Sequence, residues 1–444
     1  MTDLQALYTH FLAHPQVVTD TRKIVPGALF FALKGASFDG NAFAHTALEK
    51  GAAFAIIDDA AFATDTRCLL VENVLETLQE LARHHRRHFS IPVLGITGSN
   101  GKTTTKELVL AVMQTAGETL ATEGNLNNHI GVPLTLLRLR PEHRFAIVEM
   151  GANHQGEIAS YCQIAEPTYG LITNCGKAHL EGFGGEAGVR KGKGELFDYL
   201  RKTGGMVLRN TDAEYLKEMA AGIEKQRTYG TSESADVRGL IGRNEAGEML
   251  HFEVSSAGKT ASVTTQLVGS YNLPNALAAI AVGTYFGVSL EDCAVAISNY
   301  EPQNSRSQLL IRGNNRVVLD AYNANPTSMR AAIEAFAKSH AGTGRLWLGA
   351  MREMGNDSQQ EHRELVDFIQ QWPWKQVLLV GTEYAGLHGT YSGFETVSEA
   401  VVALLSAYPF TGETILLKGS RGSRMEEMLT LLPADEELSA GIRA

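Results

Sequence analysis

The chain has 444 residues, of which 44% are hydrophobic and 20% are charged, which is typical of a globular protein with roughly two to four domains. A formal net charge of −10 argues against a general nucleic-acid-binding protein, so we expect no nucleic-acid partner. The four cysteines are far apart with no C-x-x-C pair, which indicates neither a zinc site nor a disulfide framework. No run approaches the ~18 apolar residues of a membrane span, and the start shows no secretory signal, so we expect a cytoplasmic protein.

The first 88 residues contain an alternating pattern of strands and helices. Strand, helix and strand are expected over 28–33, 42–50 and 53–57, with a polar loop after the first strand. A helix over 76–89 follows and ends in a basic cluster at 83–88. We interpret this cluster as a solvated helix end whose positive charge complements the helix dipole.

From residue 91 onward, short apolar strands alternate with helical patterns, which predicts an α/β fold with a mostly parallel, doubly wound sheet. Alternating segments predict an antiparallel edge, and a second α/β series follows. The expected strands are 91–97, 145–150, 169–174, 205–210, 251–256, 261–268, 316–322, 345–351, 376–381 and 414–420. A helix is expected over 275–287. We therefore expect three domains: a small α/β domain over 1–88, a central phosphate-loop domain over 89–304 and a Rossmann-like domain over 305–444.

The stretch GITGSNGKTTT (95–105) follows a buried-type strand and precedes a helix that starts at Lys102. A common phosphate-binding loop, G-x-x-x-x-G-K-[ST], would need a glycine at position 96, where the chain has Ile96. Phosphate binding is still expected with the altered spacing, because backbone amides of a glycine-rich turn at a helix N-terminus bind phosphate. Lys102 can reach the β- and γ-phosphates, and the Thr103 hydroxyl can bind magnesium. The expected loop contacts are Gly98, Ser99, Asn100, Gly101, Lys102, Thr103 and Thr104.

Polar side chains also follow two neighbouring strands of the central series. Glu149 lies at the end of the apolar strand FAIVEM, Asn174 ends the next strand, YGLITN, and His179 lies in the loop that follows. Ligands gather at the carboxyl ends of parallel strands, so we expect these groups and Thr103 to converge on one magnesium site. An acid at a strand end or a single histidine would, by itself, be as readily structural as functional.

Several longer motifs accompany the loop TGSNGKTT. They are GNLNNHIGVPLTLL, VEMGANHQGEI, ITNCGKAHLEGFG, KGKGELF, GSYNLPNALAA, LDAYNANPTSM, LGAMREMG and LKGSRGSRME. With these motifs, nearly the whole chain resembles the Mur ligase family of bacterial cell-wall synthesis. That family uses its own phosphate loop, T-G-x-x-G-K-T-[ST], which accounts for the absence of a glycine at position 96.

The resemblance implies amide-bond formation driven by ATP with Mg²⁺. A substrate carboxylate would attack the γ-phosphate to give an acyl phosphate, which an amine then attacks. The best-matching members join D-alanyl-D-alanine to UDP-N-acetylmuramoyl-tripeptide (UDP-MurNAc-tripeptide), so these small molecules are the expected substrates. We also expect a monomer, and a domain closure that excludes water from the acyl phosphate.

The resemblance further implies roles for individual residues. Lys102, His179 and Lys193 would be catalytic, Glu149 would bind the first magnesium ion, and His179 would bind a second one. Lys193 aligns with a lysine that the family carries as a carbamate, which turns a cation into a metal-binding carboxylate; Lys191 is the nearby alternative.

ATP contacts are implied for four further positions. Asn272 and Asn275 would lie near the adenine, although Asn272 could instead cap the following helix. Arg306 would approach the phosphates, and Asp320 would bind the ribose hydroxyls. The family often has proline and glycine before this arginine, whereas here Asn304 and Ser305 precede it.

The two remaining substrates have weaker candidates. For the sugar nucleotide and its peptide they are Thr21, Arg22, Lys34, Gly35, Asp39, Asn125, Asn127 and Asn128. Asp39 with Gly40 could equally form an ordinary turn. For the amino substrate the candidates are Asn323, Asn325, Glu353, Lys418, Ser420 and Arg421.

Three alternatives stay open at this point. A diaminopimelate- or lysine-adding ligase usually carries a D-N-P-R signature, which is absent here. A folate polyglutamate synthase lacks the first-domain stretch DTRKIVPGALFFALKGASFDGNAF (20–43), which resembles a uridine-nucleotide domain. A non-catalytic, Mur-like ATP-binding subunit should have lost its metal ligands, yet Glu149, His179 and Lys193 are all present. A kinase or GTPase would need a motif such as N-K-x-D, which the chain does not contain.

Overall fold

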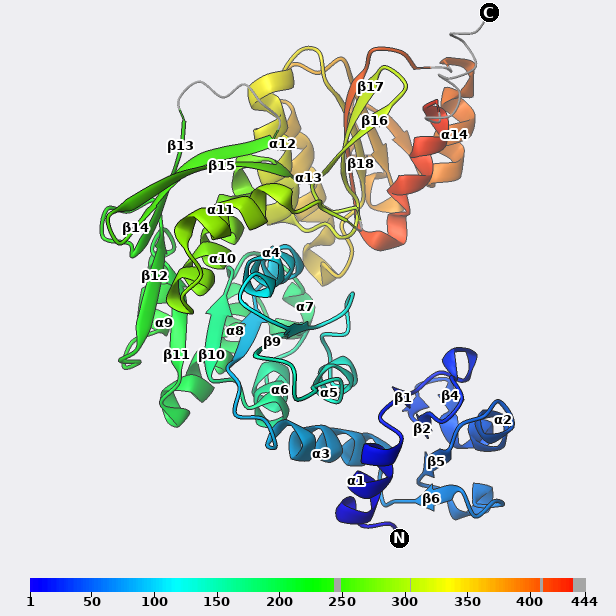
Figure 1. Cartoon of the computed structure of the whole chain (residues 1–444). Coiled ribbons are helices and arrows are strands. Elements are labelled where there is room, and N and C mark those ends of the chain that lie inside the picture. Colours follow the sequence, from blue (N-terminus) through cyan, green and yellow to red (C-terminus); the bar gives the residue numbers. More distant parts are fainter. Residues whose placement is uncertain (243–248, 304, 408–409, 434–444) are drawn as a thin grey trace, which may run out of the picture.

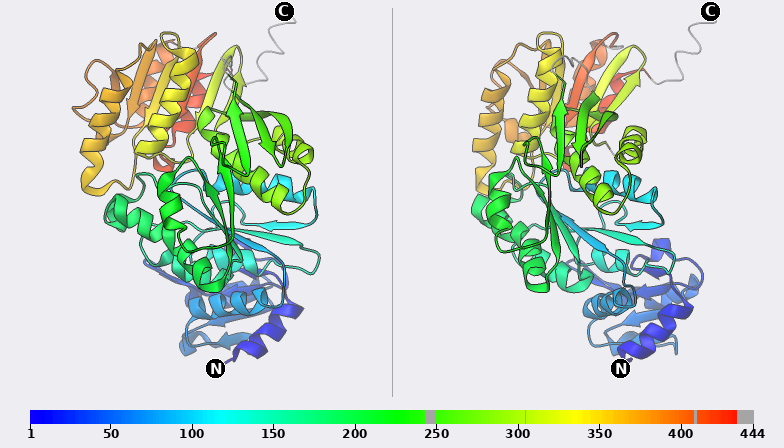
Figure 2. Two further views of the ribbon diagram at one scale, coloured as in Figure 1. Left: turned by 90° about the vertical axis from the view of Figure 1, so that its left-hand side faces the viewer. Right: turned by 60° about the vertical axis from the view of Figure 1, so that its left-hand side comes forward.

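The computed structural model describes residues 1–242, 249–303, 305–407 and 410–433 as three main sheets, a short hairpin and the surrounding helices (Figure 1). The α/β class with mostly parallel sheets is therefore confirmed. The four-stranded sheet nearest the N-terminus stands apart, whereas the nine-stranded and six-stranded sheets belong to adjoining parts (Figures 1 and 2). The strands of each main sheet all lie within one of the three expected domains.

The N-terminal sheet is parallel with strand order β1-β2-β5-β6. Its strands are β1 Val17–Val18, β2 Leu29–Phe31, β5 Phe54–Ile57 and β6 Cys68–Leu70, and its helices are α1 Leu4–Ala13, α2 Ala44–Glu49 and α3 Val74–Arg86. The loop expected after β2 contains an antiparallel hairpin, β3 Lys34–Gly35 and β4 Phe38–Asp39. The predicted strands and helices of this part are found within a few residues of their expected ends.

The basic end of α3 is only partly solvated: Arg87 and His88 are exposed, whereas His85 and Arg86 are buried, so the interpretation as a solvated helix end was wrong for these two residues. Arg86 is buried and donates from Nε to the carbonyl of Ala165 at 3.1 Å and from Nη2 to that of Glu166 at 3.3 Å. Arg87 pairs with the Glu166 carboxylate at 2.6 Å. Those carbonyls belong to the C-terminal end of α6 (Glu157–Ala165), which has no backbone donors of its own to satisfy them. The cluster therefore fastens α3 to the central domain.

The central sheet has the order β15-β14-β13-β12-β11-β10-β7-β9-β8 and is parallel except for β13–β14 and β14–β15. The antiparallel edge is thus confirmed. Its strands are β7 Val93–Thr97, β8 Thr119–Ala121, β9 Phe145–Glu149, β10 Tyr169–Ile172, β11 Met206–Asn210, β12 Gln226–Gly230, β13 Val237–Ile241, β14 Met249–Ser256 and β15 Lys259–Val268.

Helices cover both faces of the central sheet. They are α4 Lys102–Gln114, α5 Gly131–Leu136, α6, α7 Leu180–Phe183, α8 Glu186–Thr203, α9 Glu214–Met219, α10 Leu273–Tyr285 and α11 Leu290–Asn299. Successive residues of a strand point to opposite faces, and β9 shows the consequence. Phe145 and Ile147 join the core beneath α4 and α10, while Ala146 and Val148 join the core beneath α5, α6 and α8. Burial on both faces explains the continuous apolar strands seen in the sequence.

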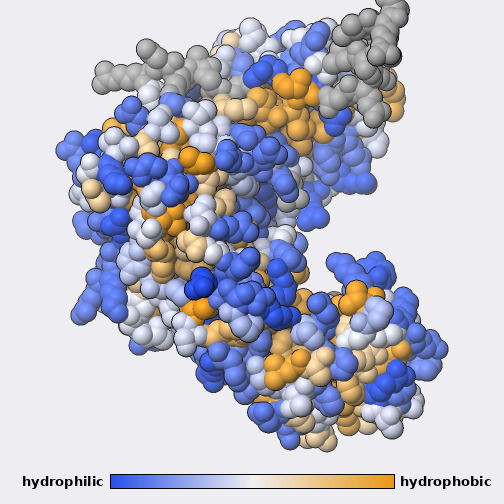
Figure 3. Space-filling model, in the orientation of Figure 1, coloured by the Kyte–Doolittle hydropathy of each residue, from blue (hydrophilic) through white to orange (hydrophobic). Residues whose placement is uncertain are grey.

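The C-terminal sheet has the order β16-β17-β21-β18-β19-β20, with only the β16–β17 pair antiparallel. Its strands are β16 Gln308–Arg312, β17 Asn315–Asp320, β18 Arg345–Gly349, β19 Gln376–Val380, β20 Ser392–Phe394 and β21 Thr414–Lys418. Its α-helices are α12 Pro326–His340, α13 Ser358–Ile369 and α14 Val397–Leu404. Figure 3 shows a deep indentation between the N-terminal part and the rest of the molecule, bordered largely by hydrophilic side chains. Within the described residues, no helix is both long and apolar enough to cross a membrane.

Candidate active site

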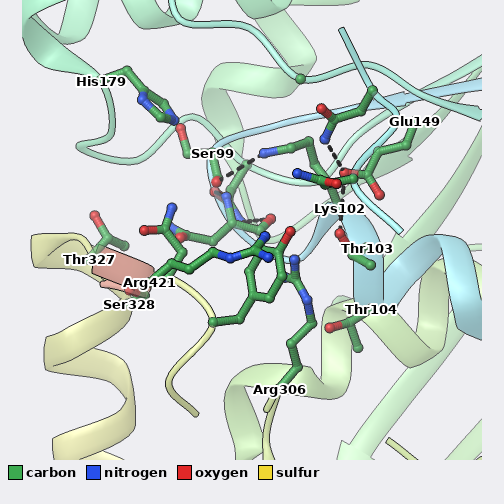
Figure 4. A pocket seen from close by; sticks show the side chains of 18 of the residues that line it. Ser99, Lys102, Thr103, Thr104, Glu149, His179, Arg306, Thr327, Ser328 and Arg421 are labelled. Carbon is green, nitrogen blue, oxygen red and sulfur yellow. Dashed lines mark hydrogen bonds between the residues drawn. The ribbon is translucent and has the colours of Figure 1, made fainter. Parts of the chain in front are cut away.

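A cavity of about 690 Å³ lies between the carboxyl ends of the central strands and the C-terminal domain. The phosphate loop, Glu149 and Asn174 line it from the central domain. Arg306 and Arg421 line it from the C-terminal domain, and Figure 4 shows both reaching toward the loop. The cavity therefore has one wall built to bind anions through backbone amides and a second that is cationic.

The phosphate loop depends on glycine at two positions. Gly101 has a φ of 80° at the start of α4, and a Cβ there would approach Asn275 Oδ1 to 2.5 Å. Gly98 has a φ of 145° and packs against Thr173 and the backbone of Asn174, directly after β10. The Asn174 side chain accepts from the Asn100 amide at 3.0 Å and donates to its carbonyl at 3.1 Å. Asn174 thus holds the loop in shape, although we expected it at the metal site.

Lys102 folds back over this loop. Its Nζ donates to the carbonyl of Gly98 at 2.6 Å and to that of Ser99 at 3.3 Å (Figure 4). Burial lowers the pKa of Lys102, the Glu149 charge opposes this change, and the positive Arg306 adds to it. An incoming phosphate would replace the two carbonyls as the partner of the ammonium.

Glu149 offers a free carboxylate oxygen beside the loop. Its Oε1 accepts from Thr103 Oγ1 at 3.2 Å and from Asn127 Nδ2 at 2.7 Å. Its Oε2 is buried and has no hydrogen-bond partner among the described residues. The described residues contain no cluster of three or more His, Cys, Asp or Glu that could hold a metal alone. The pair Thr103 and Glu149 therefore fits a magnesium ion that takes its other ligands from phosphates and water.

His179 lies at the far end of the cavity and is held from the C-terminal domain. Its Nδ1 is 2.7 Å from Glu353 Oε2, and this hydrogen bond is the main cause that lowers the pKa of Glu353. His179 and Glu353 both have left-handed backbones, with φ values of 52° and 63°.

Lys193 is enclosed in α8 behind the cavity wall. It is 1% exposed, its Nζ donates to the Ala152 carbonyl at 3.0 Å, and it lies 4.8 Å from the centroid of the Phe183 ring. Burial, and secondly the charge of Lys102, lower the pKa of Lys193 to about 7. Lys191 is exposed, so the two alternative lysines have very different environments.

Asn272 and Asn275 form a buried amide network at another wall. Asn272 Nδ2 donates to the Val268 carbonyl at 2.8 Å and to Ser307 Oγ at 3.2 Å, and its Oδ1 accepts from Asn275 at 2.9 Å. Asn272 makes no side-chain capping bond to α10, so the capping alternative was wrong. The two side chains are rigidly oriented beside the cavity.

Two arginines share one aromatic ring in the C-terminal wall. Arg306 lies 3.6 Å and Arg421 lies 5.4 Å from the centroid of the Tyr322 ring. Next to them, Lys418 pairs with Asp320 at 2.5 Å. Asp320, expected at a ribose, and Lys418, expected at the amino substrate, are therefore partners of each other.

Three family models match the chain. They are described as Mur ligase family, catalytic domain (residues 16–86), Mur ligase middle domain (96–283) and Mur ligase, glutamate ligase domain (305–421). The UDP-N-acetylmuramoyl-tripeptide–D-alanyl-D-alanine ligase of Escherichia coli is 35% identical over 423 residues, which cover 94% of this chain and 93% of that relative. The chain belongs to the Mur ligase family.

Other Mur ligases agree along nearly the whole length. The Bacillus subtilis enzyme of the same name is 34% identical over 94% of each chain. A crystal structure of MurF from Acinetobacter baumannii superposes with a TM-score of 0.84 at 31% identity, covering 94% of this chain and 92% of that one. MurF from Thermotoga maritima in complex with ADP gives a TM-score of 0.83 at 26% identity, covering 97% and 98%.

Most residues expected from the Mur ligase motifs line the cavity, but the N-terminal candidates do not. Those outside it are Thr21, Arg22, Lys34, Gly35 and Asp39. Of the central-domain candidates, Gly98 and the enclosed Lys193 do not line the cavity either. Arg22 pairs with Asp20 at 2.8 Å and Lys34 with Asp58 at 2.9 Å, while Asp39 caps a short 3₁₀ helix as an ordinary turn residue would. By contrast, Asn125, Asn127 and Asn128 all line the cavity.

The amino-substrate candidates divide in a similar way. Asn323, Glu353, Lys418, Ser420 and Arg421 line the cavity. Asn325 does not, because its side chain caps α12 and donates to Asn100 Oδ1 at 2.7 Å. This contact joins the C-terminal domain directly to the phosphate loop.

Several lining residues of this Mur ligase were not predicted from its sequence. Tyr271 donates to or accepts from Ser307 Oγ at 3.1 Å and forms part of the wall beside Asn272. Arg352 also lines the cavity and pairs with Glu383 at 2.6 Å. Tyr271 and Arg352 stand inside quoted motifs, GSYNLPN and LGAMREMG, which were the available signal.

Proposed function

We propose that this chain is an ATP-dependent ligase that joins D-alanyl-D-alanine to UDP-MurNAc-tripeptide through an acyl phosphate. The observation that carries the proposal is the cavity itself, in which a phosphate loop, a carboxylate with a free oxygen and two cationic arginines face one another. The names of the full-length relatives supply the substrates.

The proposed reaction has two steps. The terminal carboxylate of the tripeptide attacks the γ-phosphorus of ATP and ADP leaves; the amine of D-alanyl-D-alanine then attacks the acyl carbon and phosphate leaves. Carboxylate and triphosphate repel each other, so charge neutralisation and positioning dominate the catalysis. The loop amides and Lys102 would bind the phosphates, and Arg306 and Arg421 would neutralise them from the other wall. Asn272 and Asn275 would face the adenine.

Thr103 and Glu149 would hold magnesium, which neutralises charge on the phosphates when bound. We propose His179 and a carbamate of Lys193 for a second ion. To form the carbamate, the neutral Lys193 amine attacks the carbon of CO₂ and releases a proton. The buried amine of Lys193 would thereby become a negatively charged carbamate, which the positive charge of Lys102 would stabilise.

We place the three domains at residues 1–88, 89–304 and 305–444. The N-terminal domain would bind the uridine nucleotide through Thr21, Arg22, Lys34, Gly35 and Asp39. Since these candidates lie outside the cavity, the N-terminal domain would have to close over it to deliver the tripeptide carboxylate. Asn323, Ser420 and Arg421 are proposed for the amino substrate. We propose that the protein acts as a monomer in the cytoplasm, where ATP is available.

Release of phosphate from ATP, with each substrate omitted in turn, tests this proposal. Turnover should require both UDP-MurNAc-tripeptide and D-alanyl-D-alanine. Equal release with diaminopimelate or lysine in place of the dipeptide would favour another Mur-type ligase. ATP binding without any release would favour the non-catalytic alternative.

A further inference from the structure

The loop that follows β10 contacts both the phosphate loop and the C-terminal domain. On one side, Ser99 Oγ donates to the Gly176 carbonyl at 2.8 Å. On the other side, the Lys177 amide donates to Thr327 Oγ1 at 3.2 Å and its Nζ pairs with Glu361 at 2.7 Å. His179, three residues after Gly176, therefore stands on a segment that is fixed from two domains.

Glu353 is the residue that meets His179 across this interface. It follows β18 on the C-terminal domain, and its Oε2 lies 2.7 Å from His179 Nδ1. The Glu353 side chain is 56% exposed, so a pair of this kind adds little to stability. Both residues nevertheless keep left-handed backbones, which are unfavourable for non-glycine residues and cluster at functional sites.

The chemistry of the contact fixes the state of the imidazole. A carboxylate only accepts hydrogen bonds, so Nδ1 must carry the proton. The lone pair of the neutral ring is then on Nε2, the nitrogen left for a metal. Carboxylates that bind the second nitrogen of a metal-binding histidine set its tautomer and orientation and raise its basicity.

We infer that Glu353 is a positioning residue: it orients His179 across the domain interface, so that this metal ligand is correctly presented only when the C-terminal domain is docked. The inference rests on the proposed role of His179 as a metal ligand. A simpler role for Glu353 would be to bind the ammonium group of the amino substrate. In that case the loss of Glu353 would leave the metal site unchanged.

The same interface offers a matched control. Lys177 and Glu361 form an ion pair between the same two domains without touching His179. Glu361→Gln removes an interdomain ion pair of similar length, so a purely structural role of Glu353 predicts the same behaviour for Glu361→Gln and Glu353→Ala.

The first experiment needs no metal. The full-length protein labelled with ¹⁵N-histidine is examined by NMR at pH 8, and the His179 signals are assigned by their loss in His179→Asn. The wild type and Glu361→Gln should show the Nδ1–H tautomer at His179. In Glu353→Ala this tautomer should no longer predominate. An unchanged tautomer in Glu353→Ala would overturn the inference.

The second experiment titrates Mn²⁺ by electron paramagnetic resonance in the presence of a non-hydrolysable ATP analogue and UDP-MurNAc-tripeptide. Glu353→Ala should weaken the His179-dependent Mn²⁺ affinity by about 10-fold or more, and should add nothing in a His179→Asn background. Glu361→Gln should leave it unchanged. If His179→Asn has no effect, the proposed metal role of His179 fails and the inference fails with it. If His179→Asn weakens binding but Glu353→Ala does not, or only raises KM for D-alanyl-D-alanine, the inference alone is overturned.

Discussion

Replacing Glu413 by glutamine should destabilise the C-terminal domain through loss of a charge that the fold has enclosed. The Glu413 side chain is 9% exposed at the start of β21. Arg345 donates to its two oxygens at 2.8 and 3.1 Å, and Lys375 lies 2.8 Å from both. Hydrogen bonds from Arg345 first, and then from Lys375, lower the pKa of Glu413 to about 2 from 4.5.

That difference in pKa corresponds to about 3 kcal/mol of unfolding free energy at neutral pH. Since Lys375 is 48% exposed, solvent screening reduces its share, and we expect Glu413→Gln to cost about 2–3 kcal/mol. The folded pKa is the lower one, so the stabilisation is fully present above pH 4.5 and is lost as the pH falls toward 2. Most of the difference between wild type and variant should have disappeared by pH 3.

Urea unfolding followed by tryptophan fluorescence measures this effect. All three tryptophans, Trp347, Trp372 and Trp374, lie in the C-terminal domain, so the signal reports that domain. Glu395→Gln, at an exposed glutamate of the same domain, should change stability by less than about 0.5 kcal/mol. Equal stability of Glu413→Gln and wild type at pH 7, or a difference that persists undiminished at pH 3, would contradict a stabilising role for the Glu413 charge.

Three further changes test the site and its attachment to the rest of the chain. Gly101→Ala forces a side chain onto a φ of 80° and against a buried amide oxygen, so the Kd of an ATP analogue by calorimetry should rise at least about 10-fold; an unchanged Kd would contradict the loop geometry. Lys193→Ala should abolish phosphate release, and added acetate or formate should restore part of it, whereas Lys191→Ala should be silent; full activity of Lys193→Ala would exclude the carbamate. Arg86→Ala leaves two carbonyls at the end of α6 without a donor and should cost about 2–4 kcal/mol by calorimetric unfolding, clearly more than the exposed Arg87→Ala; equal losses would show that burial of Arg86 is unimportant.

The parts of the fold that depend on local pattern could be predicted from the sequence. Buried strands such as β7 and β9 are continuous apolar runs, and the helix after the phosphate loop begins at Lys102 as expected. Because strand ends in a parallel sheet share one edge, the approach of Thr103 to Glu149 also followed from pattern.

Contacts between segments far apart in the chain were not accessible in this way. Nothing in the local sequence distinguishes Arg86, which caps a distant helix, from the exposed arginine beside it. The pairing of Glu353 with His179 likewise depends on how two domains dock, and each residue alone fits several roles. Interface residues of this kind require the three-dimensional arrangement, since their partners are set by packing rather than spacing.

An acyl-phosphate intermediate requires that one oxygen of the tripeptide carboxylate leaves with the phosphate. To follow this oxygen, UDP-MurNAc-tripeptide with ¹⁸O at both oxygens of its terminal carboxylate is incubated with ATP and D-alanyl-D-alanine. Mass spectrometry should find one ¹⁸O in the released phosphate for each amide bond formed. Phosphate without ¹⁸O, released together with the amide product, would contradict the account.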